Sequence, residues 1–533
     1  MKFVTASIMI GAFSLLSKIL GLGRILAFSN RLGLGQEFDI YVAAFRLPDL
    51  IFNLLILGTL SVAFIPVLVG YLNKNREEAE KFSSTIFNFT LLVMGVFGVL
   101  GFLLSGWFAK IIVPGFSADA QAATASLTRI LMLSPVFFSL SSVLTAYLHS
   151  FKRFFIAAIS PLFYNLSIIA GVIFLYPKFG LPGIAWSVVA GAFLHFLLQF
   201  PMGIRLGLKP LRFWDLSQQG VKKFAKLFLP RVFGLELGQI SLLATSVLGS
   251  YLASGTLAVF YIAYDLETVP VGIFAVSFAI AAFPMLSEFF EKGDMSSFRT
   301  FFSRTAVQIL FLIIPISVLT ILLRAQIVRL IPGALEGTKF TFADTRLTAE
   351  ALGFFAISLF AQSLVPLLAR CFYAMRNTII PVISGLVAGV INIGLAIILR
   401  PLASPYAFAI AFSIAAIAQM LILFIWLRRR LAEFDDEFLY VRTIKICISS
   451  IIMAMTAYLT LYLVAPLVNM VAYWGILVQT LSAVAVAAAT YLGAGLLVKL
   501  PEARGLFGIL RSWFAKFTRP VTSAIVNAFT DFR

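Results

Sequence analysis

Long apolar segments follow one another along almost the whole chain, and short polar turns separate them. Fourteen of these segments reach the roughly 20 residues that a helix needs to cross the hydrocarbon core of a bilayer. They cover residues 3–28, 38–71, 84–110, 123–149, 155–176, 181–204, 224–250, 254–288, 300–323, 347–373, 378–399, 403–427, 442–465 and 471–498. The runs are longer than the alternating segments of about ten residues that build a membrane β-barrel. The pattern predicts an all-α polytopic membrane protein with about 14 transmembrane helices.

Composition supports this prediction. Hydrophobic residues make up 61% of the 533 positions, charged residues only 12%, and the mean hydropathy is +1.01. A soluble fold of this length has too little interior to bury so much apolar surface, so a soluble enzyme and a disordered chain are excluded. The first segment lacks the short apolar core and cleavage site of a signal peptide, and we expect it to be retained as a helix.

The sequence contains no pattern of catalytic or metal-ligating residues. Cys371 and Cys447 both lie in apolar runs, and the chain has only two histidines. Neither a disulfide framework nor a metal site is therefore expected, and the GxxxxGK and HExxH motifs are absent from the sequence. We expect no enzymatic activity, no cofactor and no metal.

Basic residues predict the orientation in the membrane. The chain carries 41 Lys and Arg against 23 Asp and Glu, a net charge of +18. Given the predicted helices, 27 cations lie in segments on the N-terminal side of the membrane and 8 on the opposite side. Cytoplasmic segments are enriched in Lys and Arg, so both termini are predicted to be cytoplasmic. The same bias explains the basic composition without a nucleic-acid partner.

An internal repeat predicts two lobes. Residues 146–160 align with residues 370–384, and residues 63–66 align with residues 281–284, at an offset near 220 residues. The offset spans six predicted helices, an even number, so both copies have the same orientation. We predict two parallel six-helix lobes, an N-lobe at 1–206 and a C-lobe at 220–429, followed by two further helices at 438–500. Repeats of this kind are typical of transporters that hold substrate between the lobes.

The C-terminal segment 501–533 has a different character. Apolar residues recur at helical spacing, and cations fall between them: Leu506, Phe507, Leu510, Trp513, Phe514 and Phe517, with Arg504, Arg511, Lys516 and Arg519. This pattern favours an amphipathic helix that lies on anionic lipids of the inner leaflet. A frayed tail is the alternative.

The first two apolar segments contain five charged residues: Lys18, Arg24, Asp39, Arg46 and Asp49. A charge at mid-bilayer is costly and normally faces a wet cavity or a partner. Asp39 and Arg46 share a helix face, as do Arg46 and Asp49. The glycines at 21 and 23 can loosen the helix beside Arg24, and loosened helices flanked by cations suit an anionic substrate. Snorkelling side chains or a structural ion pair are the alternatives.

The second lobe contributes mainly carboxylates. Glu236, Asp265 and Glu267 lie within its apolar segments, and the last two precede Pro270. Acidic groups inside a transporter lobe are candidates for gating or for binding a coupling Na⁺ or H⁺. Pairing with cations of the opposite lobe is an equally supported alternative.

Residues 16–68 carry a family resemblance. The stretch Leu16-Ser-Lys-Ile-Leu-Gly-Leu-Gly-Arg24, then Asp39, then Val42-Ala-Ala-Phe-Arg-Leu-Pro48, and finally Ala63-Phe-Ile-Pro-Val-Leu68 resembles the opening of the MurJ (MviN) lipid II flippases of the MOP exporter superfamily. The resemblance extends over essentially the whole chain and includes the helix count. It implies export of an undecaprenyl-pyrophosphate-linked peptidoglycan precursor across a bacterial cytoplasmic membrane, by alternating access through a cationic cavity. It also implies a lipid-tail groove at helices 13 and 14.

The resemblance assigns the substrate site to matching positions. Arg24 and Asp39 match the family, Lys18 stands where Arg is usual, Arg46 keeps a basic position, and Asp49 replaces Asn. The chain departs from the family at other positions: Ile25 replaces an acid, Phe52 a cavity Arg and Leu57 a Glu, and Asp265 stands near a usual Arg.

Three other functions remain as alternatives. One is a MOP exporter of polysaccharide lipids or drugs, and another is a non-transporting scaffold with degenerate cavity charges. A membrane glycosyltransferase would need carboxylates or a metal motif on sizeable loops, but the longest loop, 324–346, has only Glu336 and Asp344 as acids. The sequence does not distinguish coupling to Na⁺, to H⁺ or to the membrane potential, and it identifies no protein partner.

Overall fold

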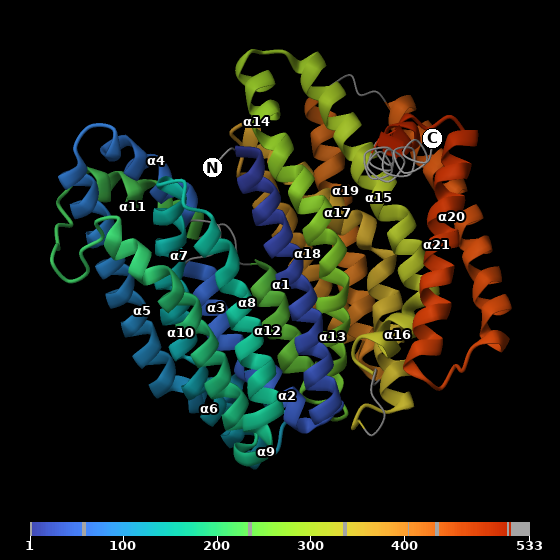
Figure 1. Cartoon of the computed structure of the whole chain (residues 1–533), viewed down its shortest axis with the longest axis horizontal. Helices are drawn as coiled ribbons and strands as arrows, with labels where there is room; N and C mark the ends of the chain where they lie inside the picture. Colours follow the sequence, from blue (N-terminus) through green and yellow to red (C-terminus); the bar gives the residue numbers. More distant parts are fainter. Residues whose placement is uncertain are drawn as a thin grey trace, which may run out of the picture. The chain divides into compact units, whose positions relative to one another are not determined.

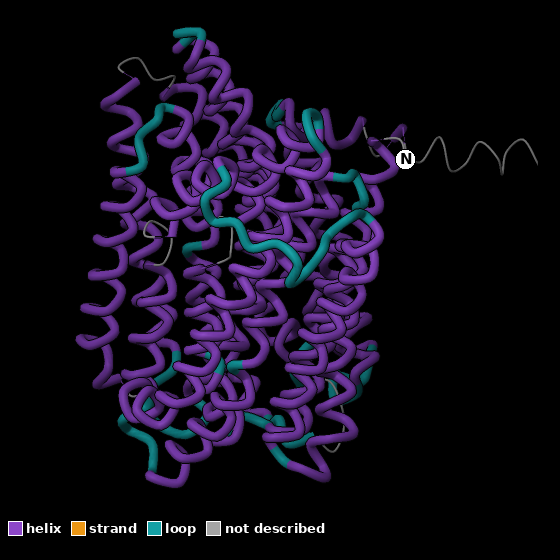
Figure 2. The backbone as a smooth tube through the Cα atoms, turned by 90° about the vertical axis from the view of Figure 1, so that its left-hand side faces the viewer, coloured by secondary structure: helices purple, strands orange, loops and turns teal. Residues whose placement is uncertain are grey.

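The computed structural model describes residues 3–55, 60–232, 237–333, 338–402, 404–431, 436–508 and 511–512. Within these ranges the chain forms helices and connecting loops and contains no strand (Figure 2). Eleven helical runs are long and apolar enough to cross a membrane, and a pair bent by 45° at Ser358 raises the number to twelve. The prediction of an all-α membrane protein with many spans is confirmed.

The helices follow the predicted segments closely. In chain order they are α1 (Phe3–Leu32), α2 (Gln36–Ala44), α3 (Arg46–Leu55), α4 (Leu60–Leu72), α5 (Arg76–Ile112), α6 (Ala118–Leu131), α7 (Leu133–Ser150), α8 (Phe155–Ala170), the π-helix η1 (Gly171–Leu175), α9 (Tyr176–Phe179), α10 (Leu181–Arg205), α11 (Gln219–Val232), α12 (Leu237–Gly249), α13 (Thr256–Pro270), the π-helix η2 (Val271–Val276), α14 (Ser277–Glu291), α15 (Met295–Leu330), α16 (Phe342–Ile357), α17 (Leu359–Ala374), α18 (Ile379–Leu399), the 3₁₀ turn η3 (Arg400–Leu402), α19 (Tyr406–Leu431), α20 (Asp436–Val464), the 3₁₀ turn η4 (Ala465–Leu467) and α21 (Tyr473–Leu497).

Two predicted spans do not correspond to any helix long enough to cross a membrane in the described residues. Segment 38–71 contains α2, α3 and α4, and segment 224–250 contains α11 and α12. Pro48 explains the break between α2 and α3, because proline has no N–H to donate to the carbonyl of Ala44. The Thr128 hydroxyl donates to that carbonyl instead, at 3.3 Å. The count of fourteen spans stays a prediction.

The chain divides into two compact units, each built from separate stretches of sequence. Unit 1 contains Met1–Leu266, Ile331–Ala351 and Val382–Ala415, and unit 2 contains Glu267–Leu330, Leu352–Pro381 and Ala416–Arg533. Unit 1 thus includes the whole predicted N-lobe together with parts of the predicted C-lobe. The lobe boundaries at 206 and 220 stay a prediction.

Unit 1 is a bundle in which α8 packs between α1 and α10, and α7 packs against α4, α5 and α10 (Figure 1). Aromatic and aliphatic side chains fill its core, among them the fully buried Phe64, Phe82 and Tyr147. Phe52, which the family resemblance places at the position of a cavity arginine, packs against Phe138 with ring centroids 5.7 Å apart. That position contributes to hydrophobic packing.

Unit 2 centres on α15. This helix packs against α17, α20 and α21, and α14 packs against α17. Tyr491 of α21 donates to the carbonyl of Phe311 at 2.7 Å, which ties the C-terminal helix pair to α15. Residues 501–508 are helical, and most of the predicted amphipathic tail lies outside the described residues.

Candidate functional site

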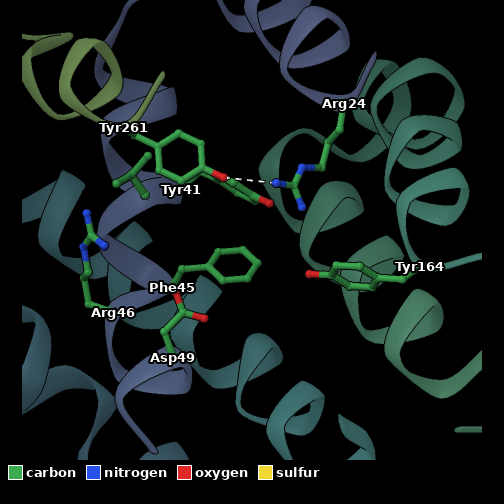
Figure 3. A pocket seen from close by; sticks show the side chains of 8 residues that line it. Arg24, Tyr41, Phe45, Arg46, Asp49, Tyr164 and Tyr261 are labelled. Atoms are coloured by element: carbon green, nitrogen blue, oxygen red, sulfur yellow. Dashed lines mark hydrogen bonds between the residues drawn. The ribbon is translucent and has the colours of Figure 1, made fainter. Parts of the chain in front are cut away.

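A cavity of about 200 Å³ lies inside unit 1. Its lining comes from α1, α8, α13 and the α2–α3 region: Arg24, Tyr41, Val42, Phe45, Arg46, Asp49, Tyr164 and Tyr261. Figure 3 shows Arg24, Tyr164 and Tyr261 directed from different helices toward the same space. Two guanidinium groups, one carboxylate and three phenols therefore converge in a protein built to span the bilayer.

Arg24 reaches the cavity from an unbroken helix. The expected loosening at the glycines is wrong, because α1 continues through positions 21–23. The physical reason is the packing of α1 as a whole against α8. It outweighs the cost of glycine in a helix, which is about 1 kcal/mol per residue.

Asp265 and Tyr261 contact the Arg24 guanidinium. An Arg24 Nη2 atom lies 3.6 Å from Asp265 Oδ2 and 3.4 Å from the Tyr261 hydroxyl, to which it donates. The Arg24 side chain is 18% exposed, and the Asp265 side chain is 35% exposed. This contact matches one of the two alternatives stated for Asp265, namely pairing with a cation of the first lobe. Both distances are long for charge-assisted bonds, so a stronger anion can compete for the guanidinium.

Arg46 and Asp49 line another side of the cavity. Both lie in the first turn of α3, and Arg46 Nε donates to Ser246 Oγ of α12 at 2.9 Å. Arg46 is 7% exposed. Figure 3 shows the Asp49 carboxylate next to Phe45, with Arg46 further to the left of the view. The structure thus brings three predicted site residues, Arg24, Arg46 and Asp49, into one lining.

Asp39 lies outside the cavity lining and joins α2 to α13. Its buried carboxylate accepts hydrogen bonds from the backbone N–H groups of Gly255 at 2.6 Å and Ala258 at 2.8 Å. A carboxylate suits this position because the N-terminus of a helix carries free N–H groups and a partial positive charge. Gly255 has a φ of +90°, a backbone conformation that glycine adopts more readily than any other residue. Tyr261 and Asp265 also lie on α13, so Asp39 fixes the first turn of the helix that carries both of them.

We expect Asp39→Ala to lower the free energy of unfolding by about 2 kcal/mol, because two charge-assisted hydrogen bonds are lost from a buried helix end. Thermal unfolding of the detergent-purified protein measures this change. The matched control is Glu37→Gln, which removes an exposed charge on the same helix but keeps an oxygen that can accept from the Tyr176 hydroxyl. It is expected to change stability by less than about 0.5 kcal/mol. Equal unfolding temperatures for Asp39→Ala and the parent would rule out the capping role.

The remaining predicted residues are not part of this lining. Lys18 is exposed on α1, and Glu236 lies outside the described residues. Glu267 belongs to unit 2 and is 1% exposed. Among the described residues, neither carboxylate oxygen of Glu267 has a hydrogen-bond partner with good geometry. The side chain of Gln362 lies near this carboxylate.

Sequence reasoning missed the three tyrosines of the cavity. Tyr41, Tyr164 and Tyr261 each lie within one of the predicted apolar segments, and none of them belongs to a recognisable motif. A tyrosine hydroxyl inside the bilayer needs a hydrogen-bond partner, and this requirement is the signal that could have identified them. It does not say that the three tyrosines line one cavity together with Arg24.

Comparison of the sequence with known families and with known proteins indicates the same family in both cases. A family described as "Lipid II flippase MurJ" matches residues 28–498. The lipid II flippase MurJ of Burkholderia cenocepacia is 28% identical over 452 residues, which cover 81% of this chain and 84% of the relative. The probable lipid II flippase MurJ of Haemophilus influenzae is 29% identical over 407 residues, covering 73% of this chain and 79% of the relative.

Solved structures are similar over most of the chain. A lipid II flippase MurJ in an inward closed conformation aligns with a TM-score of 0.74 and 26% identity, covering 91% of this chain and 98% of that one. An inward-facing MATE family multidrug transporter of the MOP superfamily aligns with a TM-score of 0.66 and 15% identity, covering 78% and 94%. The second likeness concerns the fold alone.

Proposed function

Because the chain belongs to the lipid II flippase MurJ family, we propose that it moves lipid II, a polyprenyl-pyrophosphate-linked peptidoglycan precursor, from the inner to the outer leaflet by alternating access. The family is one of transporters, and in this proposal the chain catalyses no chemical reaction. Export of another lipid or of drugs, and a scaffold role, are less well supported. The relatives named above are a lipid II flippase and a probable one, and the similarity covers most of the length of each.

The cavity in unit 1 is the observation that carries this proposal. Arg24 presents a planar fork that matches two oxygens of a pyrophosphate. The hydroxyls of Tyr41, Tyr164 and Tyr261 line the same space and can donate to the remaining oxygens. Entry of a pyrophosphate displaces the weak contact between Arg24 and Asp265, so binding and the internal ion pair compete for one guanidinium.

The lipid tail of the substrate lies, in this proposal, along the C-terminal helix pair. An apolar pocket on α20 is lined by Met455, Thr456, Tyr458, Leu459 and Tyr462. Three of these residues, Met455, Tyr458 and Tyr462, are more than 60% exposed. Such a surface suits an isoprenoid chain, which stays in the hydrocarbon while its headgroup passes through the protein.

The protein spans a membrane many times, and we place it in a bacterial cytoplasmic membrane with both termini inside. The support is the excess of cations on the N-terminal side. The segment after residue 501 then lies at the inner leaflet, where its cations bind anionic lipids.

Cysteine labelling tests this orientation. Lys74→Cys and Arg429→Cys lie on the side predicted to be cytoplasmic, so an impermeant thiol reagent is expected to label them only after the cells are opened. Lys178→Cys, on the opposite side, is the control that should react in intact cells. The parent chain provides the blank, because Cys371 is buried and Cys447 partly buried. Labelling of position 74 or 429 in intact cells would reverse the topology.

Glu267 is the residue best suited to couple transport to an ion gradient. A buried carboxylate without a strong partner is stabilised by taking up a proton or a cation. Flipping by purified protein in liposomes, measured with an imposed H⁺ gradient, Na⁺ gradient or membrane potential, distinguishes the three driving forces.

Complementation tests the main proposal. The unmodified chain is expected to restore growth of a bacterial strain depleted of its own lipid II flippase. Failure to restore growth, with normal amounts of protein in the membrane, would favour the scaffold alternative.

A further inference from the structure

The loop between α10 and α11, residues 206–218, is held against the N-terminal half of α5 by hydrogen bonds. Figure 2 shows it as a long segment that crosses in front of the helices. Backbone groups of the loop pair with polar side chains of α5: Lys209 N with Ser84 Oγ at 3.0 Å, Leu211 N with Asn88 Oδ1 at 2.9 Å, Phe213 O with Asn88 Nδ2 at 2.8 Å and Asp215 N with Thr85 Oγ1 at 3.2 Å. The loop is therefore held along about one turn of the helix.

Both ends of the loop are held as well. The Tyr147 hydroxyl donates to Leu206 O at 3.0 Å, and Gln218 Nε2 donates to the Glu78 carboxylate at 2.7 Å. Lys209 Nζ forms an ion pair with Glu80 at 2.5 Å. Four backbone groups of the loop are thus paired to side chains of α5, which lowers the cost of placing the loop at the boundary of the hydrocarbon.

The length of α5 places the loop at that boundary. The helix has 37 residues and is about 55 Å long, whereas the hydrocarbon core is about 30 Å thick. Trp107 and Lys110 are exposed near its C-terminal end and are residue types that prefer the interface. Counting back about 20 residues from Lys110 reaches Thr90. By this count Asn88, which holds Leu211 and Phe213, falls just beyond the hydrocarbon core, at the level expected for the headgroups.

The loop presents apolar side chains to its surroundings. Leu211 is 82% exposed, Trp214 53% and Leu216 43%. Leu211 also has a φ of +63°, a conformation that is unfavourable for a residue other than glycine. A strained backbone that displays a large apolar side chain points to a partner that receives this side chain.

The segment that carries these apolar side chains is rich in cations. Residues 205–226 contain Arg205, Lys209, Arg212, Lys222, Lys223 and Lys226 and one acid, Asp215. Two carboxylates of α5 also lie against the loop, Glu78 beside Gln218 and Glu80 paired with Lys209. Hydrogen bonds from Ser217 hold the pKa of Asp215 below its usual value, so this acid is ionised at neutral pH. The Phe213 ring lies 6.0 Å from Lys209 Nζ and 5.7 Å from the Arg212 guanidinium carbon. Lys209 is paired with Glu80, whereas Arg212 is exposed and forms no ion pair with a described carboxylate.

We propose that the 206–218 loop is a fixed interfacial anchor that binds anionic phospholipids, with Leu211 and Trp214 inserted among the lipids and Arg212 on a lipid phosphate. Apolar and aromatic groups with adjacent cations are the combination that binds an anionic bilayer surface. In the orientation proposed above, this surface is the cytoplasmic leaflet. The inference does not depend on transport.

The first test measures where the loop lies. An environment-sensitive fluorophore is attached to the full-length Leu211→Cys variant, and the protein is placed in nanodiscs that contain phosphatidylglycerol. We expect strong quenching by a lipid spin-labelled near its headgroup and weak quenching by aqueous iodide. Lys74→Cys, at the exposed turn before α5, is the control and should show the reverse. A label at 211 that iodide quenches, or that neither agent reaches, would overturn the anchor.

The second test measures charge selectivity. The preference of the full-length protein for spin-labelled phosphatidylglycerol over phosphatidylcholine is compared between Arg212→Gln and Lys292→Gln. The second variant removes the same charge from an exposed lysine that pairs with Glu288. Arg212→Gln is expected to weaken anionic lipid binding at the loop about fivefold, the effect of one cation at an anionic surface, with little change for Lys292→Gln. Equal effects of the two variants would contradict the site.

Discussion

Replacing Arg24 by alanine is expected to abolish rescue of a flippase-depleted strain while the protein remains in the membrane at near-normal levels. The substitution removes a guanidinium that can hold a pyrophosphate through two bonds. Hydrogen bonds to charged groups contribute about 1.5–3 kcal/mol each, so the loss corresponds to a hundredfold or greater weakening of binding. Protein levels should persist because the lost contacts with Tyr261 and Asp265 are long and partly exposed.

Two further variants sharpen this prediction. Arg24→Lys keeps the charge but loses the planar fork, so it should retain little activity. Arg129→Ala is the matched control, because Arg129 also lies within an apolar span but is exposed and bonds to Ser105, away from the cavity lining. Normal growth with Arg24→Ala would remove this residue from the substrate site.

The second large effect is expected at Asp265. Asp265→Asn removes the negative charge that faces Arg24 at 3.6 Å, so the guanidinium becomes more available to an anionic lipid. For a partly exposed pair the contribution is about 1 kcal/mol, which raises affinity severalfold. Turnover is expected to fall, because the product no longer has an internal competitor that helps to release it. Substrate binding and flipping by purified protein in liposomes measure both quantities.

Asp265→Arg restores the charge that is usual for the family near this position and is expected to remain active. Glu350→Gln serves as the control, since Glu350 forms an exposed i,i+4 pair with Arg346 and should leave binding and flipping unchanged. If both Asp265 variants bind and flip like the parent, the competition between Asp265 and substrate is wrong and the carboxylate is structural.

The hydrophobic pattern alone determined the class of fold and the position of nearly every helix. This succeeds because the need to pair backbone groups in lipid acts on each segment separately, so local sequence is sufficient information. The same reasoning identified Arg24, Arg46 and Asp49 as unusual, since a charge in an apolar helix needs a partner wherever that partner lies.

Only the tertiary structure decided what those partners are. Asp39 bonds to backbone groups 216 and 219 positions later in the chain, Arg46 bonds to a serine 200 positions later, and Arg24 bonds to a tyrosine 237 positions later. Helical periodicity defines the face that a side chain occupies but not the helix that packs against that face. For this reason Asp39, which shares a charged pattern with its neighbours in sequence, caps a distant helix, whereas three tyrosines without any sequence motif complete the cavity.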